Sequence, residues 1–216
     1  MTKVGLSQRV EEVDAYNERR DCLDQRWAPL IRSFGLDPVP LMNQIEDVDT
    51  YVDRLQLDGI VLTGGNDFAY LESGTNVALE RDRFERSLLK IAIDRELPVL
   101  GVCRGLQLIN IHCGGSIRTI DDHVAVEHDL EINTQATSVT DPPAQIIVNS
   151  YHGCGIDGED LGKELSVVGR ASDGSIEWLE HERHPITGIM WHPERESPSE
   201  ELDRRIISDR LPTKPV

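Results

Sequence analysis

Cys103 stands where the chain changes its hydrophobic period, and its neighbours suit a nucleophile. Residues 98–102 form a short apolar run typical of a buried strand, whereas the apolar residues that follow have helical spacing. A strand-to-helix corner strains its central residue and requires small neighbours, and Gly101 and Gly105 lie two positions to either side. Free N–H groups at the start of the helix favour a thiolate, and Arg104 adds a nearby cation. The pattern predicts a nucleophile, although most free cysteines are small buried core residues.

A cysteine nucleophile needs a base, and His192 with Glu194 is the candidate pair. The apolar run 186–191 predicts a strand that ends just before His192, and Pro193 favours an extended backbone there. Alternate residues of an extended chain point to the same side, so Glu194 can orient the imidazole. The base would take the thiol proton and later protonate the leaving amine. Alone, a His-Pro-Glu sequence is more typical of a turn, but together with the cysteine corner it favours a triad.

The remaining polar candidates are binding residues rather than catalysts. Residues 149–152, Asn-Ser-Tyr-His, follow an apolar run and fit a binding loop at a strand end. Arg9 follows the first expected strand, at the sheet edge where ligands of open α/β folds bind. Arg19, Arg20 and Arg26 crowd the same region, and such a group can hold a carboxylate or phosphate, although solvated surface charge is its commoner role.

The order of elements predicts an α/β fold with a mostly parallel sheet, because strands and helices alternate up to the cysteine corner. The expected strands of this part cover 4–7, 37–42, 58–63 and 98–102. The expected helices cover 23–34, 48–55 and 79–95, followed by the one after Cys103. Leu79, Phe84, Leu88, Ile91 and Ala92 are expected to face inward. Later β-like segments predict antiparallel ribbons at the sheet edge, at 116–120, 123–132, 145–150, 165–171, 175–181 and 186–191. A last helix is expected over 199–207.

Composition limits the function classes. The 216 residues suit a single domain, residues 1–216, and no apolar run is long enough to span a bilayer. The start of the chain lacks the pattern of a signal peptide, so we expect a cytoplasmic protein. A net charge of −17 argues against nucleic acid and anionic membranes as partners. Four cysteines without paired spacing do not form a disulfide framework, and no histidine and cysteine set has metal-site spacing, so we expect no metal.

Three motifs together resemble a known family. Gly-Val-Cys-Arg-Gly-Leu-Gln at 101–107 and Trp-His-Pro-Glu at 191–194 are similar to class I glutamine amidotransferases. Asn-Ser-Tyr-His at 149–152 narrows the resemblance to the γ-glutamyl hydrolase branch, peptidase family C26, which includes γ-glutamyl-γ-aminobutyrate hydrolases. The amino-terminal part, around 5–9 and 16–27, is similar to a smaller subgroup of compact enzymes of bacterial surface-polysaccharide synthesis, among them γ-glutamyl-CDP-amidate hydrolase.

The resemblance implies a flavodoxin-like α/β domain in which a central, mostly parallel sheet is flanked by helices and carries an antiparallel extension. It implies Cys103 as nucleophile, His192 as base and Glu194 as its orienter. The implied oxyanion hole consists of the backbone N–H groups of Gly65 and Arg104. The expected substrate-binding residues are Gln107, Asn149, Ser150, Tyr151, His152 and Arg9. The implied reaction is hydrolysis of a small-molecule γ-glutamyl amide through a thioester, without a cofactor.

Two other functions use the same sequence features. A glutaminase subunit that passes ammonia to a separate synthase would share the triad, and a catalytically silent binding module would share the fold. Neither the leaving amine nor the oligomeric state follows from the sequence, and a homodimer is among the options.

Overall fold

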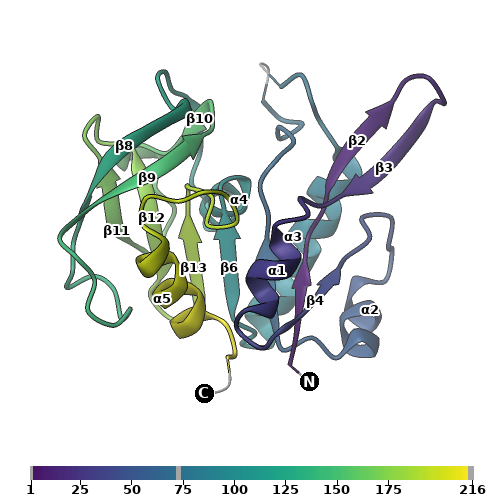
Figure 1. Ribbon diagram of the computed structural model, residues 1–216. Coiled ribbons are helices and arrows are strands. Elements are labelled where there is room, and N and C mark those ends of the chain that lie inside the picture. Colours follow the sequence, from purple (N-terminus) through teal and green to yellow (C-terminus); the bar gives the residue numbers. More distant parts are fainter. Residues whose placement is uncertain (1, 72–73, 214–216) are drawn as a thin grey trace.

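The computed structural model describes residues 2–71 and 74–213, which form three layers with a nine-stranded sheet in the middle (Figure 1). The strands lie in the order β4 (Asp37–Pro40), β1 (Lys3–Leu6), β5 (Gly59–Leu62), β6 (Val99–Val102), β13 (Ile186–Ile189), β12 (Ile176–His181), β11 (Leu165–Ala171), β8 (Val124–Ile132) and β9 (Gln145–Tyr151). The first five run parallel, and each of the others pairs antiparallel with its neighbour. The expected fold class is therefore confirmed.

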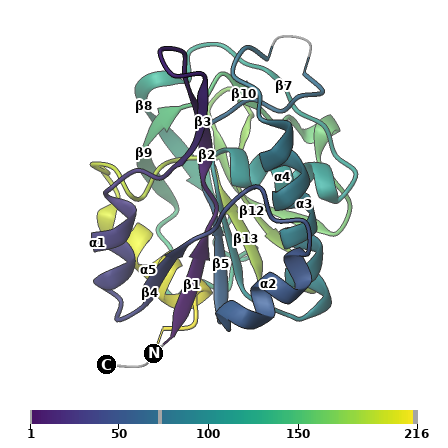
Figure 2. The same ribbon diagram turned by 90° about the vertical axis from the view of Figure 1, so that its right-hand side faces the viewer.

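Helices cover both faces of the sheet (Figure 2). The helices are α1 (Trp27–Arg32), α2 (Val48–Leu55), α3 (Leu79–Asp94), α4 (Arg104–His112) and α5 (Glu200–Arg210). Trp27 of α1 and Ile206 of α5 pack into one hydrophobic core, whereas Phe84 of α3 and Leu106 of α4 pack into a second core on the opposite face. Within residues 2–71 and 74–213, no helix is both long and apolar enough to cross a membrane.

The hydrophobic pattern predicted the central strands because these strands are buried on both faces. Every residue of β5, β6 and β13 is buried, as parallel strands covered by two helical layers must be. The proline-containing β4 lies at the sheet edge. Prolines are tolerated there because an edge strand pairs on one side only and can do without some of its N–H donors. The segments expected at 123–132, 145–150, 165–171 and 175–181 form antiparallel strands, and the last helix runs from Glu200 to Arg210 rather than ending at 207. The segment expected as an edge ribbon at 186–191 instead forms β13, which lies inside the sheet and runs parallel to β6, because its residues are buried on both faces.

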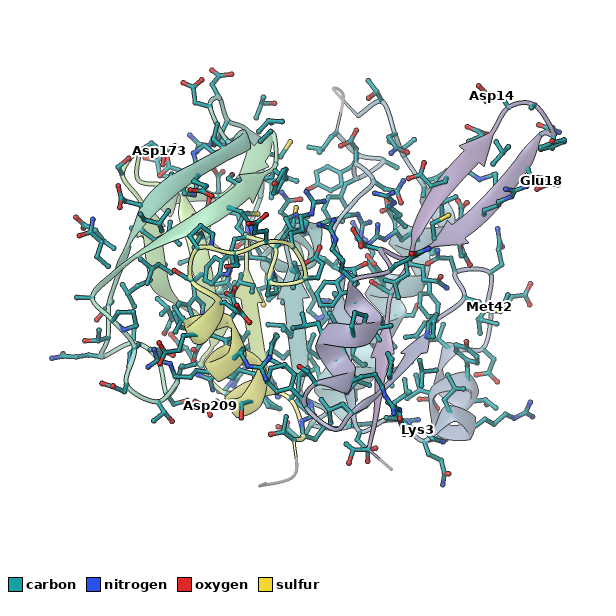
Figure 3. The ribbon with its side chains drawn as sticks, viewed as in Figure 1. Lys3, Asp14, Glu18, Met42, Asp173 and Asp209 are labelled. Atoms are coloured by element: carbon teal, nitrogen blue, oxygen red, sulfur yellow. The ribbon has the colours of Figure 1, made fainter. Side chains whose placement is uncertain are left out.

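Residues 9–22 form an element that the sequence did not predict. They form a hairpin of β2 (Arg9–Val13) and β3 (Glu18–Cys22), which projects from the layers (Figures 1 and 3). Most of its residues are exposed, so no buried face gave the sequence an alternating apolar signal. Two smaller strands, β7 (Arg118–Thr119) and β10 (Cys154–Gly155), form a separate antiparallel pair.

Two helix details also differ from the prediction. The first helix begins at Trp27 rather than at 23, because the Asp24 carboxylate accepts from the N–H of Arg26 in a turn before it. Leu79, expected to face inward, is 54% exposed because it is the first residue of α3.

Gly105 lets α4 lie directly on β5. A Cβ added to Gly105 would lie 2.9 Å from the carbonyl carbon of Leu62 and closer still to its oxygen, and backbone atoms of a central strand cannot move aside. We expect Gly105→Ala to lower the free energy of unfolding by about 2 kcal/mol or more, through overpacking. Urea denaturation followed by tryptophan fluorescence measures this loss.

Gly153→Ala is the matched control, because a Cβ there meets no atom within 4 Å. We expect it to change the free energy of unfolding by no more than about 0.5 kcal/mol. Equal stability of the two variants would contradict the close approach of helix and strand.

Candidate active site

Cys103 forms the corner between β6 and α4. Its φ of 54° and ψ of −107° lie in a region that costs a non-glycine residue about 1–3 kcal/mol. The Cys103 N–H donates to the carbonyl oxygen of Ile189 over 2.8 Å, which anchors the corner to β13. A Cβ on Gly101 would lie 2.7 Å from the carbonyl carbon of Gly105, so the two glycines meet beneath the cysteine. The surrounding backbone thus holds the strained corner that the glycine spacing predicts.

His192 and Glu194 lie just beyond β13 and are buried together. His192 Nδ1 is 2.7 Å from Glu194 Oε1. Because a carboxylate accepts, Nδ1 carries a proton and Nε2 is left for the sulfur. A Cβ added to Gly64 would lie 2.8 Å from His192 Cε1 and 3.4 Å from Cys103 Cβ. The imidazole and the cysteine therefore meet above Gly64, at the carboxyl end of the parallel strands.

Asn149 fixes the loop that carries the base. Its side-chain nitrogen donates to the carbonyl oxygens of His192, over 3.0 Å, and Glu196, over 2.9 Å. Its side-chain oxygen accepts from the His192 N–H over 2.9 Å. Asn149 is buried and lines neither cavity beside Cys103. The structure thus gives it a supporting position behind His192 rather than the substrate contact expected from the sequence.

The pairing of Cys103 with His192 shifts both pKa values. Burial raises the pKa of the Cys103 thiol, but the hydrogen bond with His192 and the nearby imidazolium charge outweigh burial and hold the pKa below its usual 9.0. Burial lowers the pKa of His192, whereas its hydrogen bonds with Cys103 and Glu194 raise that pKa to about 9. Both shifts favour a thiolate and imidazolium pair at neutral pH.

The charge of the Arg104 side chain is paired within the fold, which corrects the expectation of a free cation beside the sulfur. Its guanidinium forms ion pairs with Asp82 and Glu85 of α3 and stacks on Phe68, 4.1 Å from the ring centre. What Arg104 offers the site is its backbone N–H, which hydrogen bonds to the Cys103 sulfur and helps to lower the thiol pKa.

Arg81 of α3 fixes the loop after β5, which contains Gly65. This fully buried guanidinium donates to the carbonyl oxygens of Thr63, over 2.7 Å, Gly64, over 3.0 Å, and Gly65. The Gly64 carbonyl and the Gly65 N–H belong to the same trans peptide and point in opposite directions. Because this carbonyl faces Arg81, the Gly65 N–H points away from Arg81. Glu85 accepts from Arg81 Nε over 2.8 Å and neutralises its charge.

Two cavities meet at Cys103, with volumes of about 350 Å³ and 230 Å³. Both are lined by Gly65, Cys103 and Tyr151. The larger cavity also contacts Asn66, Asp67, Phe68, Gln107, Thr119, His152 and Cys154. The smaller one also contacts Arg9, Asp24, Trp27, His192, Glu194 and Arg195. The site therefore offers a separate space on each side of the sulfur.

The other expected binding residues divide between the cavities and the core. Gln107 lines the larger cavity, where its side-chain nitrogen donates to the Cys154 carbonyl oxygen over 2.8 Å. Tyr151 packs edge-on against His192, with ring centres 5.7 Å apart. Ser150 lines neither cavity, because its hydroxyl is buried and donates to the His123 carbonyl oxygen over 2.6 Å.

The amino-terminal arginines do not form a single anion site. Arg19 pairs with Glu80 at 2.7 Å, Arg20 with Glu18 at 2.5 Å, and Arg26 with Asp24 at 2.6 Å. Arg9 pairs with Glu11 at 2.9 Å but also lines the smaller cavity.

Sequence reasoning missed two arginines of this site. Arg195 lines the smaller cavity and stacks on Tyr151, 4.0 Å from the ring centre, and its position directly after Glu194 was the available signal. Arg81, four residues before Glu85, has the spacing of an ordinary surface pair on a helix, so nothing in the sequence marked it as buried.

Comparisons with known proteins agree with the sequence motifs. The Peptidase C26 family model matches residues 4–194. A γ-glutamyl-CDP-amidate hydrolase from Campylobacter jejuni is 30% identical over 90% of each chain. The γ-glutamyl-γ-aminobutyrate hydrolase PuuD of Escherichia coli K12 is 26% identical, over 84% of this chain and 82% of that protein.

Solved structures support the fold. A putative GMP synthase subunit from Thermoplasma acidophilum superposes with a TM-score of 0.73 at 22% identity, over 96% of this chain and 92% of that one. A glutamine amidotransferase from Thermotoga maritima gives 0.65 at 16% identity, over 96% and 81%. The family match and the similar hydrolases confirm the resemblance to glutamine amidotransferase-like γ-glutamyl hydrolases, and the chain belongs to the Peptidase C26 family.

Proposed function

We propose that this protein hydrolyses a γ-glutamyl amide through a thioester on Cys103. The observation that carries the proposal is the meeting of Cys103 and His192 above Gly64, with Glu194 2.7 Å from the outer imidazole nitrogen. Membership of the Peptidase C26 family supports the same reaction class, as do two relatives that are named as γ-glutamyl amide hydrolases.

The reaction proceeds in two steps. The Cys103 thiolate attacks the γ-carbonyl carbon, and the backbone N–H groups of Gly65 and Arg104 donate to the resulting oxyanion, each contributing about 3 kcal/mol. The C–N bond then breaks, and the His192 imidazolium gives its proton to the leaving amine. Water then attacks the thioester carbonyl carbon while His192 takes one of its protons, and the C–S bond breaks to release glutamate and restore the Cys103 thiolate and His192 imidazolium.

The two cavities divide the substrate between them. We assign the glutamyl group to the larger cavity, beside Gln107 and His152, and the leaving amine to the smaller one, because His192 borders that side. Arg9 and Arg195 also line the smaller cavity and suit an anionic leaving group. The Campylobacter relative, which is named for a CDP-amidate, makes a nucleotide-linked amidate the first candidate. We place this reaction in the cytoplasm and in surface-polysaccharide synthesis, as the resemblance of the amino-terminal part implies.

Glutamate release by the purified protein tests the reaction. We expect release from at least one γ-glutamyl amide in a panel that includes glutamine, γ-glutamyl-γ-aminobutyrate and nucleotide-linked amidates. Cys103→Ala should lower this rate at least about a thousandfold, because no thioester can form. Cys113→Ala, outside both cavities, is the control and should retain the rate.

Release by Cys103→Ala at the unsubstituted rate would contradict the mechanism. Release from glutamine alone, and only with an added synthase, would instead identify a glutaminase that supplies ammonia to that synthase. A protein that binds panel members without converting any of them would be a binding module.

The pH dependence of Cys103 alkylation tests the thiolate and imidazolium pair. In the unsubstituted protein His192 holds the thiol pKa below its usual 9.0, so iodoacetamide should react faster at neutral pH than it would with a thiol that lacks this partner. His192→Ala removes the stabilising partner and leaves burial to raise the pKa. Because one pKa unit is a tenfold change in thiolate, we expect alkylation at pH 7 to slow about tenfold or more.

Loss of the His192 proton should also set the highest pH at which His192 speeds the alkylation of Cys103. The imidazolium is lost as the pH rises through about 9. Above that pH, the difference in Cys103 alkylation rate between the unsubstituted protein and His192→Ala should therefore shrink. His184→Ala, whose partner is the surface residue Glu96, is the control and should leave the profile unchanged. An identical profile for His192→Ala and the unsubstituted protein would refute the pairing.

A further inference from the structure

Three buried side chains from separate parts of the antiparallel half converge behind the larger cavity. His123 lies just before β8, His152 just after β9, and Glu177 within β12. The side chain of Glu177 is fully buried, and each histidine is 4% exposed. One nitrogen of each histidine and one oxygen of Glu177 all lie within 4.8 Å of one another. Glu177 Oε1 is 3.2 Å from His152 Nε2 and 3.5 Å from His123 Nδ1.

In each histidine one ring nitrogen, the inner one, faces Glu177, and the other, the outer one, faces a different acceptor. His123 Nε2 lies 3.0 Å from Asp173 Oδ2, and His152 Nδ1 lies 3.1 Å from the Cys154 carbonyl oxygen. These outer nitrogens therefore carry protons, and in the neutral tautomer each inner nitrogen presents a lone pair toward Glu177. Metal-binding histidines have this arrangement, because a carboxylate or carbonyl behind the ring fixes both its tautomer and its orientation.

The nitrogen and oxygen atoms that face the centre of this cluster have no hydrogen-bond partner among the described residues. His123 Nδ1, His152 Nε2 and both oxygens of Glu177 are buried and make no hydrogen bond with any described residue. His128 Nε2 is also buried without a partner, 3.8 Å from Glu177 Oε2. Buried polar atoms are ordinarily satisfied, and a buried carboxylate is costly unless it is paired or coordinates a metal. A cation between these atoms would satisfy them together.

We propose that His123 Nδ1, His152 Nε2 and Glu177 Oε1 bind a divalent transition-metal ion, Zn²⁺ in the first instance. Two imidazoles and one carboxylate are ligands typical of zinc, whereas Mg²⁺ and Ca²⁺ prefer sites made wholly of oxygen. His128, whose Nε2 lies 3.8 Å from Glu177 Oε2, is the candidate for a fourth ligand. Asp173, at the outer end of the antiparallel half (Figure 3), and the Cys154 carbonyl support the ligands. This site goes beyond the proposed hydrolysis; it shares His152 with the larger cavity, and its test does not require turnover.

The sequence did not indicate this site. The ligands are 29 and 25 residues apart along the chain, far from the spacing of a metal motif, and only the pairing of β8 with β9 and of β11 with β8 and β12 brings them together. The expectation of no metal rested on that spacing alone.

Zinc binding is best tested with Cys103→Ala protein, because the Cys103 and His192 pair could itself hold zinc. After treatment with a chelator and its removal, calorimetric titration with Zn²⁺ should show one bound equivalent. Glu177→Gln in the same background should weaken this binding at least about a hundredfold. His184→Ala is the control for surface histidines and should bind zinc as before. Circular dichroism checks that every variant is folded.

Anomalous scattering at the zinc edge, from crystals of Cys103→Ala protein grown with Zn²⁺, locates the ion without the Glu177 substitution. We expect a peak between His123, His152 and Glu177. No bound equivalent in the titration, or a peak only elsewhere, would overturn the proposal and leave these histidines as protonated partners of Glu177.

Discussion

The site depends on the close approach of α4 to the ends of the parallel strands. Gly105 has no Cβ, so the helix lies against the carbonyl of Leu62, and this contact fixes where Cys103 turns. Gly64 then leaves room for the His192 imidazole above the same strand ends. Because Gly105 and Gly64 have no Cβ, the sulfur and its base can approach each other. The positive φ of Cys103 is the strained backbone conformation that this geometry requires.

Charge pairing inside the fold complements this backbone geometry. Arg81 and Arg104 are both buried, and Asp82 and Glu85 neutralise them. Burial lowers the pKa of Arg81 to about 10, so this guanidinium remains charged at neutral pH. Its charge turns the carbonyl groups after β5 inward, so the Gly65 N–H points outward. Arg81 and Arg104 therefore act on the site through the backbone rather than through their charges.

The sequence predicted those parts of the structure that depend on local pattern. The glycines around Cys103 and the apolar run before His192 marked both corners, because backbone strain and strand burial restrict residue types locally. Other features depend on distant pairing. Asn149 reaches the base loop across 43 residues, and Glu177 meets His123 across 54, so no spacing could reveal either contact. The exposed hairpin at 9–22 gave no signal because it buries little.

The central claim is the covalent glutamyl thioester on Cys103, and trapping it is the most direct test. The protein is mixed with a γ-glutamyl amide that it converts, quenched in acid and digested for mass spectrometry. The peptide containing Cys103 should gain one glutamyl acyl group, and hydroxylamine should divert the product to γ-glutamyl hydroxamate. Continued glutamate release with neither the acylated peptide nor the hydroxamate would contradict the account.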